Sequence, residues 1–117
     1  MSDAPLESRR CVPCEGGVPP LGEREAAELL RQLPEGWHLE DAGDHPQLVK
    51  EYRFRNFVEA VDFVNRLTAV AEAEGHHPDL MVAWGRVRAM LWTHAAGGLT
   101  ENDFILAAKI DRVASAS

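Results

Sequence analysis

One long amphipathic helix constrains the fold of this chain more than any other feature. The segment FVEAVDFVNRLTAVAEAE, residues 57–74, has apolar residues recurring every three or four positions, as a helix with one buried face requires. The predicted apolar face consists of Phe57, Ala60, Val61, Val64, Leu67 and Ala71. Asn56 is a favourable N-cap with Glu59 three residues later, and Gly75 is suited to end the helix. A helix of this kind needs a second layer to cover its apolar face.

Two pairs of predicted strands supply that layer. GWHLED and QLVKEYRF, separated by the turn AGDHP, precede the long helix, and DLMVAW and RVRAMLWTH, separated by Gly85, follow it. Further helices are predicted at 22–33, where Pro34 ends the pattern, and at 100–114. The order α-β-β-α-β-β-α predicts an α+β fold, in which a four-stranded antiparallel sheet has three helices packed on one face.

Length and charge restrict the classes of function. The 117 residues suit a single domain, predicted at 21–117, preceded by an extended arm at 1–20 that is rich in proline and glycine. The net charge of −7 argues against nucleic-acid binding, which needs clustered basic residues. No apolar run has the length of a membrane span, and the N-terminal segment lacks the apolar stretch of a signal peptide. We therefore expect a cytoplasmic protein without membrane or nucleic-acid partners.

The arm contains both cysteines of the chain, Cys11 and Cys14, in the stretch CVPCEGG. Such a pair can supply half of a tetrahedral zinc site, but the chain has no second cysteine pair to complete one. A thioredoxin-like redox motif normally follows a strand and opens a helix, whereas prolines and glycines here indicate a loop. We interpret the pair as reduced thiols without catalytic chemistry.

The stretch EGHHPD concentrates the chemistry. His77 precedes Pro78 and is therefore expected to be extended, so that the side chains of His76 and His77 point in different directions. Glu72 lies one helical turn before His76 and could orient its imidazole. Histidine exchanges protons near neutral pH, which favours acid–base catalysis. A metal site is disfavoured because the two side chains diverge, and a purely structural polar turn is the third alternative.

The wider pattern resembles that of the pterin-4a-carbinolamine dehydratases, known in animals also as a dimerisation cofactor of a homeodomain transcription factor. The matching residues, in order along the chain, are Glu72, His76, His77, Pro78, Trp84, His94 and Asp103. The segment THAAGGLTENDFILAAKID is also similar to the family sequence, and the resemblance covers residues 21–113. The arm resembles the leader of bacterial and plant members.

The resemblance implies a hydro-lyase that converts a 4a-hydroxytetrahydropterin, such as 4a-hydroxytetrahydrobiopterin, to the quinonoid dihydropterin and so recycles the cofactor of aromatic amino acid hydroxylases. It implies His76, His77 and His94 as catalytic residues, with His77 and His94 as the principal proton donor and acceptor. No metal and no cofactor are expected, because the reaction involves no redox change. The family forms homodimers or homotetramers. Two alternatives remain: a pterin-binding role in molybdopterin metabolism, and a non-catalytic coactivator or regulatory scaffold.

The remaining residues of the pattern have structural interpretations as well. Asp103 follows Thr100 by three residues and is expected to cap the last helix, with an indirect role in the site. Trp84 is expected either in the core or at the pocket wall, and Pro78 is expected to fix the backbone. His38 and His45 match no position and are expected on the surface. Leu80 stands where animal members have an aromatic residue.

Overall fold

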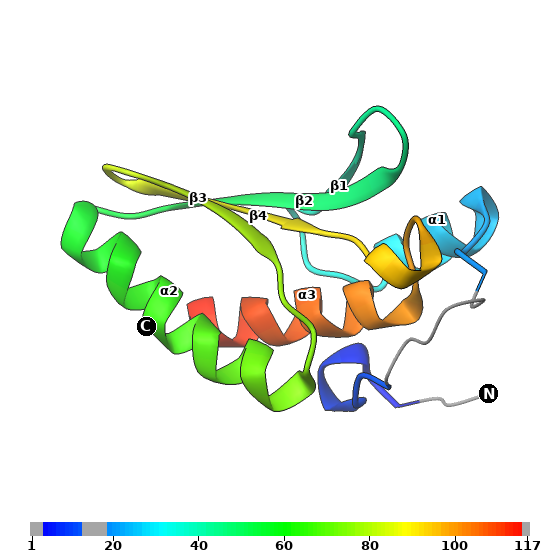
Figure 1. Ribbon diagram of the computed structural model, residues 1–117. Coiled ribbons are helices and arrows are strands. Elements are labelled where there is room, and N and C mark those ends of the chain that lie inside the picture. Colours follow the sequence, from blue (N-terminus) through cyan, green and yellow to red (C-terminus); the bar gives the residue numbers. More distant parts are fainter. Residues whose placement is uncertain (1–3, 13–18, 116–117) are drawn as a thin grey trace.

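A single antiparallel sheet organises the molecule, as the computed structural model shows for residues 4–12 and 19–115 (Figure 1). Its strands are β1 (His38–Asp41), β2 (Pro46–Arg53), β3 (Asp79–Ala83) and β4 (Arg86–Leu91). They lie in the order β1-β2-β4-β3, so that the two hairpins meet through β2 and β4 at the centre. The register pairs Leu48 with Leu91 and Tyr52 with Val87. The predicted sheet is confirmed.

Three helices cover one face of this sheet, and the predicted α-β-β-α-β-β-α order is confirmed (Figure 1). They are α1 (Glu23–Arg31), α2 (Phe57–Glu74) and α3 (Glu101–Ser115). Asn56 caps α2 by accepting a hydrogen bond from the backbone N–H of Glu59, as predicted. No helix among residues 4–12 and 19–115 combines the length and apolarity that crossing a membrane requires.

The buried face of α2 differs in detail from the predicted one. Its buried residues are Ala60, Phe63, Leu67 and Ala71. Phe57, expected on that face, lies in the first turn and is 50% exposed, whereas Phe63 is fully buried. The reason is that Phe57 precedes the point where α2 reaches the core, and Phe63 contacts the aromatic rings of Tyr52 and Phe54 beneath the sheet.

A buried carboxylate joins α3 to the sheet. Asp111 accepts hydrogen bonds from Trp37 Nε1 at 2.6 Å, Tyr52 Oη at 2.6 Å and Lys50 Nζ at 2.7 Å. Burial and the neighbouring charge of Asp111 raise the pKa of Tyr52 far above its usual value, so the phenol remains a donor. These bonds fix the position of α3 against β2.

The arm is not wholly extended. Leu6–Ser8 form a short 3-10 helix in which Leu6 is buried, and this turn packs against α3. The expectation of an extended segment is therefore wrong for these residues, because Leu6 is apolar enough to anchor the arm in the core. Cys14 lies outside the described residues.

Candidate functional site

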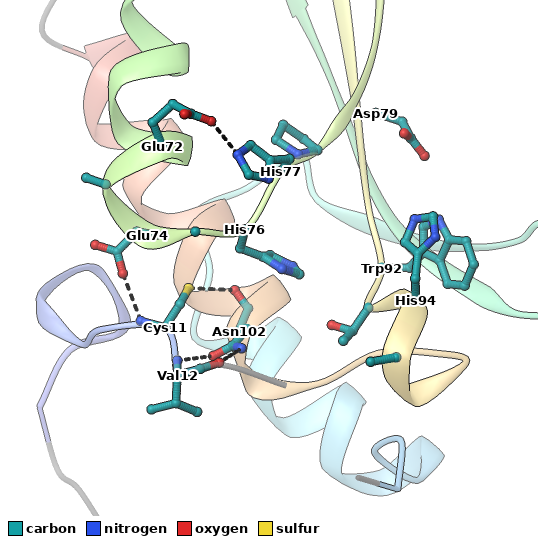
Figure 2. Close-up of a pocket in the computed structure, with 15 residues that line it drawn as sticks. Cys11, Val12, Glu72, Glu74, His76, His77, Asp79, Trp92, His94 and Asn102 are labelled. Atoms are coloured by element: carbon teal, nitrogen blue, oxygen red, sulfur yellow. Dashed lines mark hydrogen bonds and ion pairs between the residues drawn. The ribbon is translucent and has the colours of Figure 1, made fainter. Parts of the chain in front are cut away.

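A cavity of about 670 Å³ lies where segments distant in the sequence converge (Figure 2). The end of α2 and the start of β3 form one side, the turn after β4 forms another, and the arm and the start of α3 close the third. Five of the seven residues that carry the resemblance line it: Glu72, His76, His77, Pro78 and His94. The fold thus brings together three imidazoles that are separated by up to 18 positions in the sequence.

The end of α2 separates the two adjacent histidines. Gly75 adopts a left-handed conformation with φ 65°, where glycine carries no steric penalty, and the chain leaves the helix there. His76 and His77 then project in different directions (Figure 2). Each lies beside a different carboxylate, His76 beside Asp103 and His77 beside Glu72. The predicted divergence of the His76 and His77 side chains is observed, but the predicted contact between Glu72 and His76 is not. Glu72 contacts His77 rather than His76, because the chain changes direction at Gly75 instead of continuing as a helix.

His76 is paired with a buried carboxylate. Its Nε2 lies 2.6 Å from Oδ1 of Asp103, whose side chain is fully buried, and only 13% of the His76 side chain is exposed. The other oxygen of Asp103 accepts hydrogen bonds from Thr93 Oγ1 at 3.0 Å and from the backbone N–H of Thr100 at 2.9 Å. These bonds satisfy the carboxylate and hold the imidazole in one orientation.

His77 is paired with a carboxylate in an exposed setting. Its Nε2 lies 2.5 Å from Oε2 of Glu72, and 60% and 69% of the two side chains are exposed. Water screens such a pair, so it constrains the ring less firmly than the buried pair constrains His76. The cavity therefore contains one firmly held imidazole and one at its open rim.

His94 follows β4 in a short turn. The bridge between Thr93 and Gly98 closes this turn, and Gly97 adopts φ 70° as the left-handed residue that ends it. The exposed imidazole of His94 stacks on the indole of Trp92, with 3.9 Å between the ring centroids and an interplanar angle of 24°. The turn thus brings the third imidazole to the cavity on the side opposite Glu72 (Figure 2).

The aromatic residue at this cavity is not the one singled out in the sequence. Trp84 lies in the turn between β3 and β4, is 73% exposed, and is neither in the core nor among the residues that line the cavity. Trp92 lines the cavity instead. The expectation that His45 lies on the surface is also wrong, since only 13% of its side chain is exposed. Strand alternation, which places Trp92 and His94 two residues apart, is the sequence signal that could have identified Trp92.

The arm reaches the cavity through a specific set of hydrogen bonds (Figure 2). The side-chain amide of Asn102 donates to the carbonyl of Val12 at 2.6 Å and accepts from its N–H at 3.0 Å. The backbone N–H of Cys11 donates to Oε1 of Glu74 at 2.8 Å. Glu74, with 6% of its side chain exposed, also lies 3.5 Å from the ammonium of Lys109. Cys11 and Val12 consequently form part of the cavity wall.

The environment of Cys11 does not activate its thiol. Burial and the negative charge of Glu74 raise the pKa of Cys11 to about 12, so the group remains a neutral thiol near pH 7. Its Sγ donates to the backbone carbonyl of Asn102 at 3.6 Å. Within residues 4–12 and 19–115, no cluster of three or more histidine, cysteine or acidic side chains could hold a metal ion.

The arrangement is suited to moving protons to and from a molecule bound in the cavity. His76 and His77 each engage a carboxylate through Nε2, which leaves Nδ1 as the second nitrogen for proton exchange. His94 lies across the cavity from them. Imidazoles on two sides of one cavity can protonate one part of a bound molecule and deprotonate another.

Comparisons with known proteins agree on one family. The profile described as pterin 4 alpha carbinolamine dehydratase matches residues 19–113. Proteins from Rickettsia canadensis and Rubrobacter xylanophilus, each named "Putative pterin-4-alpha-carbinolamine dehydratase", are 51% and 52% identical to the chain. The alignments cover 91% and 92% of this chain and 94% and 97% of the two relatives. A relative of the same name from Methylococcus capsulatus is 46% identical over 98% of both chains.

Two solved structures share the fold. A crystal structure described as a transcriptional coactivator/pterin dehydratase from Brucella melitensis has a TM-score of 0.73 and 34% identity, and the match covers 81% of this chain and 98% of that one. A pterin dehydratase-like protein, described as a RuBisCO assembly factor in the alpha-carboxysome, has a TM-score of 0.59 and 26% identity, with 71% and 94% covered.

Proposed function

Because this chain belongs to the pterin 4 alpha carbinolamine dehydratase family, we propose that it removes water from a 4a-hydroxytetrahydropterin to give the quinonoid dihydropterin. The product is the form from which a reductase regenerates the tetrahydropterin used by aromatic amino acid hydroxylases. The observation that carries the proposal is the convergence of His76, His77 and His94 on one cavity. The relatives' shared name supports the same reaction.

The chemistry of the elimination matches these groups. The bond between C4a and the hydroxyl oxygen breaks, and the oxygen leaves as water after receiving a proton from an acid. The adjacent ring nitrogen loses its proton to a base, and its electron pair forms the new double bond to C4a. The reaction therefore needs one proton donor and one acceptor on a single substrate, and general acid–base groups of this kind contribute about 10²- to 10⁴-fold to a rate.

The three imidazoles differ in how the protein holds them, and this supports a division of roles. The buried Asp103 constrains His76, so we assign His76 to binding the pterin and sharing the proton transfers. His77 and His94 are exposed to the cavity on different sides and are assigned the principal transfers. Glu72 and Pro78 orient His77, and Asp103 acts through His76. Trp84 has no role in this scheme because it lies outside the cavity lining.

The assay that tests this proposal uses the unmodified chain of 117 residues. An aromatic amino acid hydroxylase generates the 4a-hydroxytetrahydropterin, and its ultraviolet absorbance is followed with and without the protein. We expect the protein to accelerate the disappearance of this absorbance in proportion to its concentration. A rate equal to the spontaneous rate would reject the dehydratase activity and would favour a scaffold role, such as the assembly role described for the carboxysomal relative.

We also propose that the chain forms a homodimer or homotetramer. β3 is an edge strand of the sheet, and its exposed residues include Met81 and Val82, which are 50% and 37% exposed. Apolar side chains on an unpaired strand favour association with a second copy. Light scattering coupled to size-exclusion chromatography gives the mass directly, and a mass of 12.9 kDa, that of one chain, would contradict association.

A further inference from the structure

Three aromatic rings form a continuous stack beside the cavity. The indole of Trp92 lies between two imidazoles, with centroid distances of 3.5 Å to His45 and 3.9 Å to His94. The interplanar angles are 17° and 24°, so all three rings are close to parallel. The rings come from two different segments, because His45 lies in the turn between β1 and β2 whereas Trp92 and His94 follow β4. The overlap of Trp92 and His94 is visible at one side of the cavity (Figure 2).

This stack holds His94 in a way that differs from the other two histidines. His76 and His77 are oriented by carboxylates at 2.6 Å and 2.5 Å. For His94, no carboxylate in the described parts of the chain lies within hydrogen-bonding distance. An exposed imidazole without such a partner would rotate freely about its side-chain bonds. Contact with a flat indole restricts that rotation.

The imidazoles of His45 and His94 also exclude one role for Trp92, the stacking of a substrate on its ring. Because His45 covers one face of the indole and His94 covers the other, neither face is open for a bicyclic substrate to stack upon. Trp92 is therefore unsuited to bind a pterin through its ring face, although it lines the cavity. We propose that Trp92, supported by His45, is a positioning residue that holds the imidazole of His94 in the orientation needed for proton transfer. This inference rests on the proposed dehydratase function.

His45 is itself restricted, because only 13% of its side chain is exposed. Its Nδ1 lies 2.6 Å from Oδ1 of Asp44, and its backbone carbonyl accepts a hydrogen bond from the N–H of Ala42 at 2.9 Å. The turn between β1 and β2 thus presents one imidazole to Trp92. A positioning role predicts that shape matters more than polarity at both positions, so that another flat ring can replace either residue.

The first test measures kcat and KM for substitutions at Trp92. Trp92→Leu removes the flat ring and should lower kcat by about tenfold with KM changed by less than about threefold, since orientation rather than binding is lost. Trp92→Phe retains a flat ring and should stay within about threefold of the wild-type kcat. His45→Phe should behave like Trp92→Phe. His38→Leu, at an exposed histidine on β1, is the matched control and should leave kcat unchanged.

The second test asks whether Trp92 acts through His94. If it does, adding Trp92→Leu to a His94→Gln variant should cause no further loss of kcat, because the residue being positioned is already absent. A further tenfold loss in the double variant would overturn the proposal, as would a wild-type kcat for Trp92→Leu. An increase in KM with unchanged kcat would also overturn it, since that result indicates a substrate-binding wall.

A measurement without substrate separates this inference from the proposed function. The indole ring current should shift the NMR signals of the His94 ring protons upfield relative to those of His38, and the His94→Gln variant identifies the signals. The shift should disappear in Trp92→Leu. If the shift is present but the protein does not accelerate the dehydration, the proposed function is rejected while the stacking of Trp92 on His94 is supported. If the shift is absent in the wild-type protein, the stack is wrong whatever the activity.

Discussion

Asp103 connects the beginning of α3 to the cavity through a single imidazole. Its carboxylate is fully buried and divides its contacts: Oδ2 accepts from Thr93 and from the backbone of Thr100, and Oδ1 faces Nε2 of His76. The residue therefore acts both as a helix-terminal group and as the partner that fixes the ring and tautomer of His76.

Replacing Asp103 with asparagine tests that dual role. The amide side chain can still accept from Thr93 and Thr100 through its carbonyl oxygen, but its NH₂ group then faces His76 and forces Nε2 to become an acceptor. We expect Asp103→Asn to lower kcat by about tenfold or more because the proton moves to the other ring nitrogen. Steady-state kinetics with the generated carbinolamine measures the effect, and circular dichroism checks the fold.

Glu72→Gln provides the matched comparison, since it makes the same chemical change at the exposed partner of His77. We expect Glu72→Gln to lower kcat less than Asp103→Asn does, because water can replace the contact between Glu72 and His77. Equal kcat values for wild type and Asp103→Asn would show that the buried pair has no part in the reaction.

Residue pairings were the least predictable part of the site. The sequence indicated that His76, His77 and His94 belong to one site and that the first two diverge. It predicted that Glu72 orients His76, because Glu72 lies one helical turn before it. The left-handed turn at Gly75 instead leaves His76 beside Asp103 and His77 beside Glu72. His45 could not be identified, because its contact with Trp92 joins two segments that are distant in the sequence.

At the scale of elements, the last turn of α2 binds the arm to the domain. Glu74 receives the backbone N–H of Cys11 and lies 3.3 Å from Nε of Arg10 and 3.5 Å from Nζ of Lys109. Burial opposes ionisation of this carboxyl, but the hydrogen bond from Cys11 and the two positive charges outweigh it. The result is a pKa of Glu74 below its usual value.

A carboxyl whose pKa is lower in the folded than in the unfolded protein stabilises the fold. The stabilisation is fully present at pH values above the pKa of the unfolded chain. It is lost as the pH falls through the lower pKa of the folded protein. We expect the wild-type protein to exceed Glu74→Gln in unfolding free energy by about 1 kcal/mol near neutral pH, where the charge is present. The difference should shrink as the pH falls below the usual value of 4.5. Urea unfolding of both proteins at a series of pH values measures the difference in unfolding free energy and its dependence on pH.

Glu28→Gln, at an exposed ion pair with Arg31 on α1, is the control and should change the unfolding free energy less. A difference between wild type and Glu74→Gln that stays constant from neutral pH to well below 4.5 would contradict the assigned role of the Glu74 charge.

The elements themselves were largely predictable, because their signals are local. Periodicity located α2, and Asn56 and Gly75 marked its ends as predicted. The arm was predicted less well. The position of its 3-10 helix and its hydrogen bonds to Glu74 and Asn102 depend on contacts between residues more than 60 positions apart. The periodicity of apolar residues cannot predict such contacts.

At the scale of the whole molecule, the cavity exists only because the fold is complete. The end of α2, the turn after β4, the start of α3 and the arm each supply part of its wall. Asp111 anchors α3 to β2, and Asp103 on the same helix acts on the cavity through its contact with His76. The helices lie on one side of the sheet (Figure 1). The three imidazoles line the cavity that the end of α2, the turn after β4 and the start of α3 form.

The central claim is that the histidines of this cavity carry out the dehydration. The most direct test is the rate of carbinolamine disappearance with a triple variant in which His76, His77 and His94 are each replaced by glutamine. A His38→Gln variant is the control, because its imidazole lies on β1 and pairs with Glu40 away from the cavity. We predict that wild type and His38→Gln accelerate the reaction equally, whereas the folded triple variant leaves it at the spontaneous rate. A triple variant that remains folded and retains the wild-type rate would contradict the account.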